Sequence, residues 1–243
     1  MSAPLIETPV AILAGGLATR LRPRTETIPK SLLPVAGRPF LSHQLDWLHS
    51  QGIRNVVLCV GYLGEQIEEQ FEDGTSCGMQ LQYSFDGNTL LGTGGAIKKA
   101  LPLLGKHFFV LYGDSYLPIP WGPVLESFRQ SGKDGLMTVF HNEGRYDTSN
   151  VWFESGSIKV YDKRNRLPEM RHIDYGLSLL DSGVFDAYPV ARPFDLAQVM
   201  GALVSAQQLA GYEVSQRFYE IGSPEGLQEL ESLLSQSSHT FLL

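Results

Sequence analysis

Short apolar runs alternate with segments of helical spacing over the first 115 residues, and this alternation restricts the fold more than any other feature of the sequence. The runs Thr8–Ala14, Asn55–Val60 and His107–Tyr112 are almost continuously apolar, which is typical of strands buried on both faces. Strands that are separated by helices usually pair in parallel through right-handed crossovers. The sequence therefore predicts a doubly wound, three-layer α/β/α sandwich with a mixed, mainly parallel sheet.

Helical spacing and stop signals indicate six helices. They are expected at Phe40–Gln51, Leu63–Phe71, Ala96–Leu104, Trp121–Gln130, Phe194–Gln207 and Pro224–Ser235. Ser223 and Pro224 suit the N-cap and the first position of the last helix, and the tail after Ser235 is expected to fray. Further strands are expected at Met79–Ser84, Gly135–Phe140, Val151–Phe153, Ser157–Asp162 and His172–Leu180, the last four close enough in sequence to pair antiparallel. No repeat or linker interrupts the chain, so we expect residues 1–243 to form one domain.

Positive charge is concentrated in one short segment of an acidic chain. The net charge is −7, from 19 basic and 26 acidic residues. Between Arg20 and Arg38 five basic residues and one acidic residue give +4, which leaves −11 for the remainder. The overall charge disfavours a protein that binds nucleic acid or an anionic membrane surface. The basic segment is compatible with a local anion-binding site and with a solvated basic loop.

The cysteines and the apolar runs indicate the cellular compartment in which the protein is expected. Cys59 lies in an apolar run and Cys77 in a turn-like stretch, so the two cysteines fit a reducing compartment better than a disulfide scaffold. No apolar run approaches the roughly 18 residues of a membrane span. No basic residue precedes Arg20, as the start of a signal peptide would require. We therefore expect a cytoplasmic protein.

The segment after the first apolar run has the parts of a phosphate cradle. Adjacent Gly15 and Gly16 allow the backbone to approach a ligand closely and to direct amide groups at an anion. Arg20 can hold phosphate oxygens bidentately, and Lys30 adds a movable point charge. The segment matches neither G-x-G-x-x-G nor the NTPase phosphate loop, because a third glycine and a G-K-[ST] are both missing. In a doubly wound sheet it would lie beyond the carboxyl end of a strand, where ligands bind.

This same segment resembles the signature of the sugar-1-phosphate nucleotidylyltransferase family. That signature resembles G-G-x-G-T-R-L-x-P-x-T followed shortly by P-K, and the chain has Gly15–Thr25 in matching order and then Pro29-Lys30. The one departure is Ala18, where the family usually has glycine, and alanine is unfavourable if this position needs a positive φ. The resemblance runs from Val10 to about Leu230. It implies a Rossmann-like fold with an antiparallel extension on the sugar side.

Later segments match further motifs of the family. The resemblance implies nucleotide binding by the first-strand loop and by a glycine-rich loop, through Leu13, Ala14, Gly15, Gly16, Thr19, Gly92, Thr93 and Gly94. It implies metal ligands at Asp114, in a Gly-Asp pair, and at Glu220, which stands where the family has aspartate. Lys163 matches the family's sugar-phosphate lysine, and Asp174 and Gly176 match its Asn-x-Gly beside the sugar. Each feature alone also fits a turn, a cap or a solvated surface charge, but their order along the chain favours a site.

The resemblance implies that a nucleoside triphosphate and a sugar 1-phosphate react to give a nucleotide-diphosphate sugar and pyrophosphate. A phosphate monoester has its second pKa near about 6, so the attacking oxygen is anionic at neutral pH and needs no general base. Catalysis then depends on positioning and charge. The expected catalytic residues are Arg20 at the β- and γ-phosphates and Lys30 near the α-phosphate, with Mg²⁺ on Asp114 and Glu220. Residues 8–115 would bind the nucleotide, and residues 116–236 would bind the sugar and complete the metal site.

The substrates and the assembly are also implied only by resemblance. Leu91–Leu101 and Arg217–Glu225 look closest to the heptose-1-phosphate guanylyltransferase branch, which implies GTP and a heptose 1-phosphate. Mannose-1-phosphate guanylyltransferases and N-acetylmuramate-1-phosphate uridylyltransferases are near alternatives, and a non-catalytic nucleotide-sugar-binding regulatory subunit is an alternative of another class. A glycosyltransferase is disfavoured because Gly113–Tyr116 lacks the second aspartate of a D-x-D motif. The length leads us to expect no C-terminal β-helix domain, and many relatives self-associate, which implies a homodimer.

Overall fold

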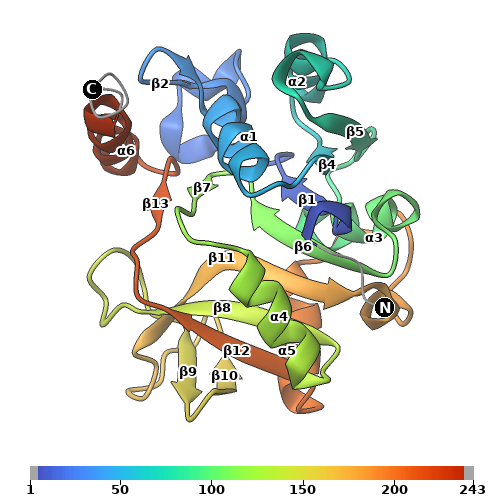
Figure 1. The fold of residues 1–243 in the computed structure, drawn as a ribbon, viewed down its shortest axis with the longest axis vertical. Helices are drawn as coiled ribbons and strands as arrows, with labels where there is room; N and C mark the ends of the chain where they lie inside the picture. Colours follow the sequence, from blue (N-terminus) through green and yellow to red (C-terminus); the bar gives the residue numbers. More distant parts are fainter. Residues whose placement is uncertain (1–4, 238–243) are drawn as a thin grey trace.

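The computed structural model describes residues 5–237, and a nine-stranded mixed sheet forms its centre (Figure 1). In spatial order the strands are β5 (Gln80–Phe85), β4 (Asn55–Val60), β1 (Val10–Leu13), β6 (His107–Tyr112), β11 (His172–Asp181), β8 (Gly135–His141), β12 (Leu209–Val214), β10 (Ser157–Tyr161) and β9 (Val151–Glu154). The first four strands are parallel, whereas β11 runs antiparallel to both β6 and β8. The predicted combination of a parallel sheet with an antiparallel extension is therefore confirmed.

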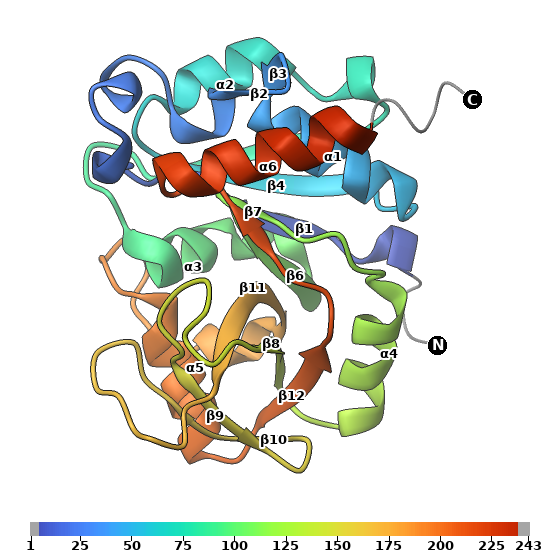
Figure 2. The ribbon, with the colours of Figure 1, turned by 90° about the vertical axis from the view of Figure 1, so that its left-hand side faces the viewer.

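Helices cover both faces of the sheet (Figure 2). One face buries the apolar sides of α1 (Phe40–Ser50), α2 (Gly64–Phe71) and α4 (Gly122–Ser131), and the other buries those of α3 (Gly92–Leu104) and α5 (Leu196–Ser205). Alternate residues of β1 serve the two layers, since Ile12 belongs to the first cluster and Ala11 to the second. The predicted three-layer sandwich is confirmed.

The order of the strands creates a switch point in the middle of the parallel part. From β1 the chain passes through α1 to β4 on one side, and from β5 it passes through α3 to β6 on the other side. The carboxyl ends of β1 and β6 therefore lie side by side at the switch point. In open α/β sheets this is where ligands bind.

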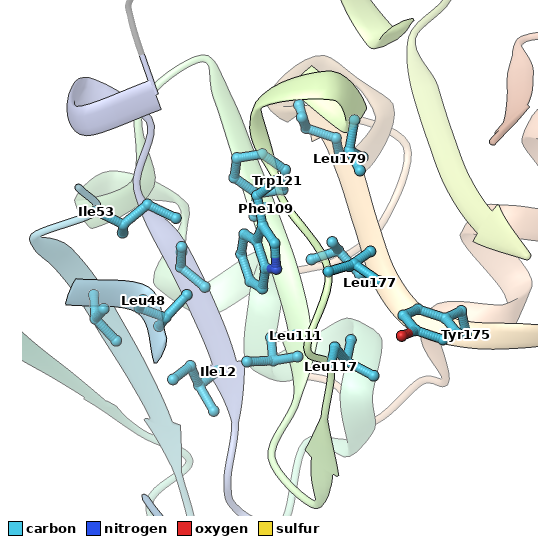
Figure 3. Close-up of a cluster of buried hydrophobic side chains, with 14 of the residues drawn as sticks. Ile12, Leu48, Ile53, Phe109, Leu111, Leu117, Trp121, Tyr175, Leu177 and Leu179 are labelled. Atoms are coloured by element: carbon cyan, nitrogen blue, oxygen red, sulfur yellow. The ribbon is translucent and has the colours of Figure 1, made fainter. Parts of the chain in front are cut away.

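The hydrophobic core behind this edge is dense in large side chains (Figure 3). Ile12, Phe109 and Trp121 have no solvent-exposed surface, and Leu48 is 1% exposed. The rings of Phe109 and Trp121 lie with their centroids 4.9 Å apart. This packing fixes β1 and β6 relative to α1, so the loops at their carboxyl ends start from a rigid base.

Some predicted elements differ in extent from those of the structure. α3 begins at Gly92 rather than Ala96, so the glycine-rich loop forms the first turn of that helix. β12 was not predicted, because Gly211 weakens its strand pattern; a Cβ on Gly211 would lie 2.5 Å from the ring of Phe153. Ser223 caps α6 (Pro224–Ser237) as predicted, since its Oγ accepts a hydrogen bond from the Gly226 amide at 3.0 Å. The remainder of the expected frayed tail, residues 238–243, lies outside the described residues.

None of the helices within residues 5–237 is long and apolar enough to cross a bilayer.

The loop after β1 contains a strained position. Ala18 has φ 48° and ψ 42°, the left-handed conformation that its place in the motif led us to consider. Thr25 Oγ1 donates a hydrogen bond to the Ala18 carbonyl at 2.9 Å, and the Leu21 amide donates to the same oxygen at 3.1 Å. These bonds hold the turn although a side chain with a Cβ disfavours it.

Replacing Phe109 by alanine should lower the free energy of unfolding by about 3–5 kcal/mol, because it removes a buried ring and leaves a cavity. Urea denaturation measures this change. Val190→Ala is the control: its side chain is 65% exposed, and it should change stability by less than about 0.5 kcal/mol. Equal effects of the two substitutions would contradict the assigned core.

Replacing Ala18 by glycine should raise the free energy of unfolding by about 1 kcal/mol, because glycine adopts a positive φ without a Cβ clash. The control is Ala202→Gly in the exposed part of α5, which should lower it by roughly 0.5–1 kcal/mol. In thermal denaturation, Ala18→Gly should therefore raise the melting temperature and Ala202→Gly should lower it. A loss of stability in both variants would show that Ala18 is not strained.

Candidate active site

Two cavities open at the carboxyl ends of β1 and β6, and they share part of their walls. The first has a volume of about 240 Å³ and its lining includes Leu13, Ala14, Gly15, Gly16, Lys30, Cys59, Asp86, Leu90, Gly92 and Thr93. The second has a volume of about 560 Å³ and its lining includes Arg20, Asn150, Lys163, Arg164, Arg166, Asp174, Gly176, Phe218 and Glu220. Tyr112 and Asp114 line both cavities. A molecule bound in one cavity can therefore meet a molecule bound in the other.

Close backbone contacts bring three strand ends together at the first cavity. A Cβ on Gly113 would lie 2.3 Å from the Leu13 carbonyl oxygen, and the Gly113 amide donates a hydrogen bond to that oxygen at 3.1 Å. A Cβ on Gly15 would lie 3.0 Å from the Gly61 amide nitrogen. Glycine at these positions lets the loops after β1, β4 and β6 converge. Gly16, by contrast, has open space around it and faces solvent, as a backbone cradle for a ligand requires.

An ion pair joins the first motif to the Gly-Asp motif. Lys30 Nζ donates a hydrogen bond to Asp114 Oδ2 at 2.7 Å, across 84 positions of sequence. The Lys30 side chain is 20% exposed and that of Asp114 is 30% exposed, so both charges are largely shielded from water. A partly buried pair of this kind places one cation and one anion at the boundary of the two cavities.

A short ladder brings Glu220 to the same place. β13 (Tyr219–Glu220) pairs antiparallel with β7 (Ser115–Tyr116), and the Ile221 amide donates to the Asp114 carbonyl oxygen at 2.9 Å. Glu220 is held by two donors, the Gly222 amide and, at 2.9 Å, the Ser223 hydroxyl. The segment around Glu220 thus lies beside the end of β6, where a metal ligand that acts together with Asp114 is expected.

Asp114 and Glu220 offer hard oxygen donors to one shared space. A Cβ on Gly222 would lie 2.4 Å from Glu220 Oε2 and 3.5 Å from Asp114 Oδ2, so glycine leaves both carboxylates room at this point. No cluster of three metal-ligating side chains occurs in the described part of the chain. Two carboxylates suit Mg²⁺, which is usually held by one or two protein carboxylates together with substrate phosphates and waters. The donor set fits that ion.

Arg20 and Thr19 lie in the 3₁₀ turn η2 (Thr19–Leu21). Unlike Lys30, neither of them lines the first cavity. Leu21 is 6% exposed and packs in the cluster around α6, which anchors the turn. Arg20 is exposed and lines the second cavity, not the first. Thr19 is exposed and is absent from the linings of both cavities.

Two tyrosines connect Lys163 with Asp174. Tyr112 and Tyr161 donate hydrogen bonds to Asp174 Oδ2 at 3.2 and 3.0 Å, while the Gly176 amide donates to Oδ1 at 3.0 Å. Burial, reinforced by the Asp174 charge, raises the pKa of both phenols well above their usual range, so both hydroxyls stay protonated as donors. Lys163 Nζ donates to the Tyr112 hydroxyl at 3.2 Å and lies 5.1 Å from that ring's centroid. Asp174 thus organises this wall of the second cavity.

In the glycine-rich turn at the start of α3, some residues line the first cavity and others pack against a neighbouring segment. Gly92, with φ +68°, and Thr93 line the first cavity. The Gly94 amide donates to the Phe194 carbonyl oxygen at 3.0 Å, and a Cβ on Gly94 would lie 2.3 Å from the Phe194 ring. Gly94 therefore packs against the segment before α5 rather than lining the cavity.

Sequence reasoning missed several residues that line the cavities. Asp86 follows β5 and accepts a hydrogen bond from the Leu91 amide at 3.0 Å, and burial raises the pKa of its carboxyl. Its position after a strand was a usable signal. Tyr112 ends β6 within an apolar run and gave none. Burial raises the pKa of the Cys59 thiol to about 12, so this cavity residue is not a thiolate nucleophile.

The chain is similar in sequence to proteins of known function. Residues 10–151 match the nucleotidyl transferase family. Relatives include the mannose-1-phosphate guanylyltransferase catalytic subunit beta of Drosophila pseudoobscura pseudoobscura, 30% identical over 90% of this chain and 60% of the relative. The D-glycero-alpha-D-manno-heptose 1-phosphate guanylyltransferase of Campylobacter jejuni is 29% identical over 88% of this chain and 94% of the relative. The chain thus spans less than two thirds of some relatives and nearly all of another.

Solved structures share the fold. HddC from Yersinia pseudotuberculosis, complexed with GMP-PN, superposes with a TM-score of 0.76 at 24% identity, over 93% of this chain and 99% of that one. A UDP-glucose pyrophosphorylase complexed with UDP-glucose gives a TM-score of 0.76 at 17% identity, over 95% and 99%. Because the family match covers more than half of the chain, the family that the motifs indicated is confirmed. The chain belongs to the nucleotidyl transferase family.

Proposed function

We propose that this protein transfers a nucleotidyl group from a nucleoside triphosphate to a sugar 1-phosphate. The observation that carries the proposal is the Lys30–Asp114 pair, 2.7 Å apart, at the wall that the two cavities share. The reaction needs two bound polyanions to meet at one phosphorus atom, with charge on both sides of it. A cation and a metal-ligating anion at the junction meet that requirement.

Each cavity has walls that suit one substrate. The first combines backbone of Gly15 and Gly16 with apolar Leu13 and Leu90, which suits a nucleoside and its phosphates. Four cationic side chains line the second cavity: Lys163, Arg164 and Arg166, which suit a sugar phosphate, and Arg20, which follows the first-strand loop and suits the end of the triphosphate. In the proposed reaction the sugar phosphate oxygen attacks the α-phosphorus in line. The bond to the β-phosphate oxygen breaks, and pyrophosphate leaves.

The chain's own residues supply binding and charge in this proposal. Lys30 stabilises the α-phosphate, Arg20 the departing pyrophosphate, and Lys163 holds the sugar phosphate. We propose that Asp114 and Glu220 hold Mg²⁺, which would neutralise phosphate charge when bound. No residue needs to remove a proton, because the phosphate nucleophile is already anionic at neutral pH.

For the substrates we propose GTP and a heptose 1-phosphate. The Campylobacter heptose 1-phosphate guanylyltransferase supports this, because this chain spans 94% of it. Mannose-1-phosphate guanylyltransferase and uridylyltransferase activities remain the alternatives. We also propose a cytoplasmic homodimer; the two free cysteines support a reducing compartment, and the dimer rests on resemblance alone. Sedimentation at micromolar concentration tests the dimer.

A pyrophosphate-release assay tests the proposed function directly. The purified chain is incubated with each of GTP, UTP, dTTP, CTP and ATP against heptose, mannose, glucose and N-acetylmuramate 1-phosphates, with and without EDTA. We expect release with GTP and a heptose 1-phosphate, abolished by EDTA. Release with another pair would correct the substrates. No release with any pair, together with retained binding of a nucleotide sugar, would support the regulatory alternative instead.

Replacing Lys30 by methionine should lower turnover by about 10²–10³, because it removes one preorganised charge from the transition state. Arg24→Met is the matched control, since Arg24 is an exposed cation of the same basic segment. The control should retain near-normal turnover. Near-normal turnover of the Lys30 variant would refute its assignment.

Replacing Glu220 by alanine should raise the Mg²⁺ concentration needed for half-maximal activity by about tenfold or more, because one metal ligand is lost. Glu225→Ala, an exposed carboxylate in the first turn of α6, should leave the titration unchanged. Thermal denaturation checks that both variants are folded. An unchanged Mg²⁺ titration for the Glu220 variant would remove Glu220 from the metal site.

A further inference from the structure

The side chain of Gln44 braces the backbone on both sides of Asp114. Gln44 lies in α1 and is 2% exposed. Its Nε2 donates hydrogen bonds to the Ser115 carbonyl oxygen at 2.8 Å and to the Tyr112 carbonyl oxygen at 3.3 Å. One amide group thus spans the turn that carries Gly113 and Asp114. The contact lies between the core and the two cavities.

Three buried polar atoms belong to side chains that line a small cavity beside this turn. They are Gln44 Oε1, Trp47 Nε1 and Trp121 Nε1, and none has a hydrogen-bond partner within the described residues. The side chains that carry them line one small cavity, with about 10 Å³ of space for the centre of a water molecule. Leu111 and Leu117 line it too, and Figure 3 shows both beside Trp121.

The hydrogen-bonding chemistry of these three atoms indicates which molecule fits the small cavity. Two carbonyl partners fix the amide orientation of Gln44, so Oε1 is left as an acceptor, and the two indole N–H groups can only donate. A water molecule can accept from both indoles and donate to the amide oxygen. The volume is that of about one water, and the lining contains no charged side chain that would select an ion.

We propose that one ordered water molecule joins Gln44 to Trp47 and Trp121, and that Gln44, held in this way, is a positioning residue for Asp114. An unpaired buried amide oxygen would favour other side-chain conformations, so the water fixes the conformer that reaches the two carbonyls. Asp114 is then held from behind by Gln44 and from the front by Lys30 and the β13 ladder. The proposal rests on the proposed function of Asp114 as a metal ligand.

Gln44→Met in the full chain tests the positioning. It keeps an unbranched side chain but removes both donors. We expect the affinity for Mn²⁺ in the presence of GTP, measured by electron paramagnetic resonance, to fall by about tenfold, as for lost supports of metal ligands. KM for the sugar 1-phosphate should change by less than about twofold, because Gln44 contacts only the main-chain carbonyl of Tyr112, and the hydrogen bonds of the Tyr112 hydroxyl with Lys163 and Asp174 remain.

Leu45→Ala is the matched control, since Leu45 is a core residue of the same helix and does not line the small cavity. It should destabilise the fold at least as much and leave Mn²⁺ affinity unchanged. An equal loss of affinity in both variants, or unchanged affinity in Gln44→Met, would overturn the positioning role. If the wild-type chain bound Mn²⁺–GTP but released no pyrophosphate, the proposed function would fail and this comparison would still decide the role of Gln44.

The water is tested separately on wild-type protein labelled with ¹⁵N. The indole N–H signals of Trp47 and Trp121 are assigned with Trp47→Phe and Trp121→Phe. Both should show cross-peaks to a long-lived water, and in Gln44→Met these peaks should weaken or vanish. No water contact at either indole in the wild-type protein would overturn the proposed hydration.

Discussion

The contact between Lys30 and Asp114 is the interaction on which the rest of the site depends. It joins the loop after β1 to the loop after β6 at Asp114, which lines both cavities. Glycine makes the approach possible, because Gly113 lies against the Leu13 carbonyl where no side chain fits. The parallel strands thus serve as rigid supports for two opposite charges. A sheet with a different strand order would leave these residues, 84 positions apart, unconnected.

Residues from other parts of the fold hold the remaining side chains of the site around this pair. β13 adds Glu220 through a two-residue ladder, while Tyr112 and Tyr161 hold Asp174, and Tyr112 accepts a hydrogen bond from Lys163. Gln44 braces the turn from the core side. Each support comes from a different part of the chain, so the geometry of the site depends on the packing of the whole fold. This suits a reaction in which positioning and charge, rather than proton transfer, lower the barrier.

The sequence predicted much of this arrangement because its strongest signals are local. Continuous apolar runs revealed β1, β4 and β6, and the glycines and basic residues after β1 indicated an anion site. The place of Ala18 in the motif raised the question of a positive φ, and the structure has φ 48° there. The features that the sequence does not show depend on tertiary contacts. Whether Gly94 lines the cavity is decided by Phe194, about a hundred residues later, and β12 forms because the space beside Gly211 accepts Phe153. No local pattern shows that Gln44 is buried against the Asp114 turn.

The most direct test of the account is a crystal structure with a non-hydrolysable GTP analogue, Mg²⁺ and a sugar 1-phosphate. The expected result is the α-phosphate within hydrogen-bonding distance of Lys30, the metal on Asp114 and Glu220, and the sugar phosphate beside Lys163. A nucleotide bound away from the loop after β1, or a metal that ignores Asp114, would contradict it.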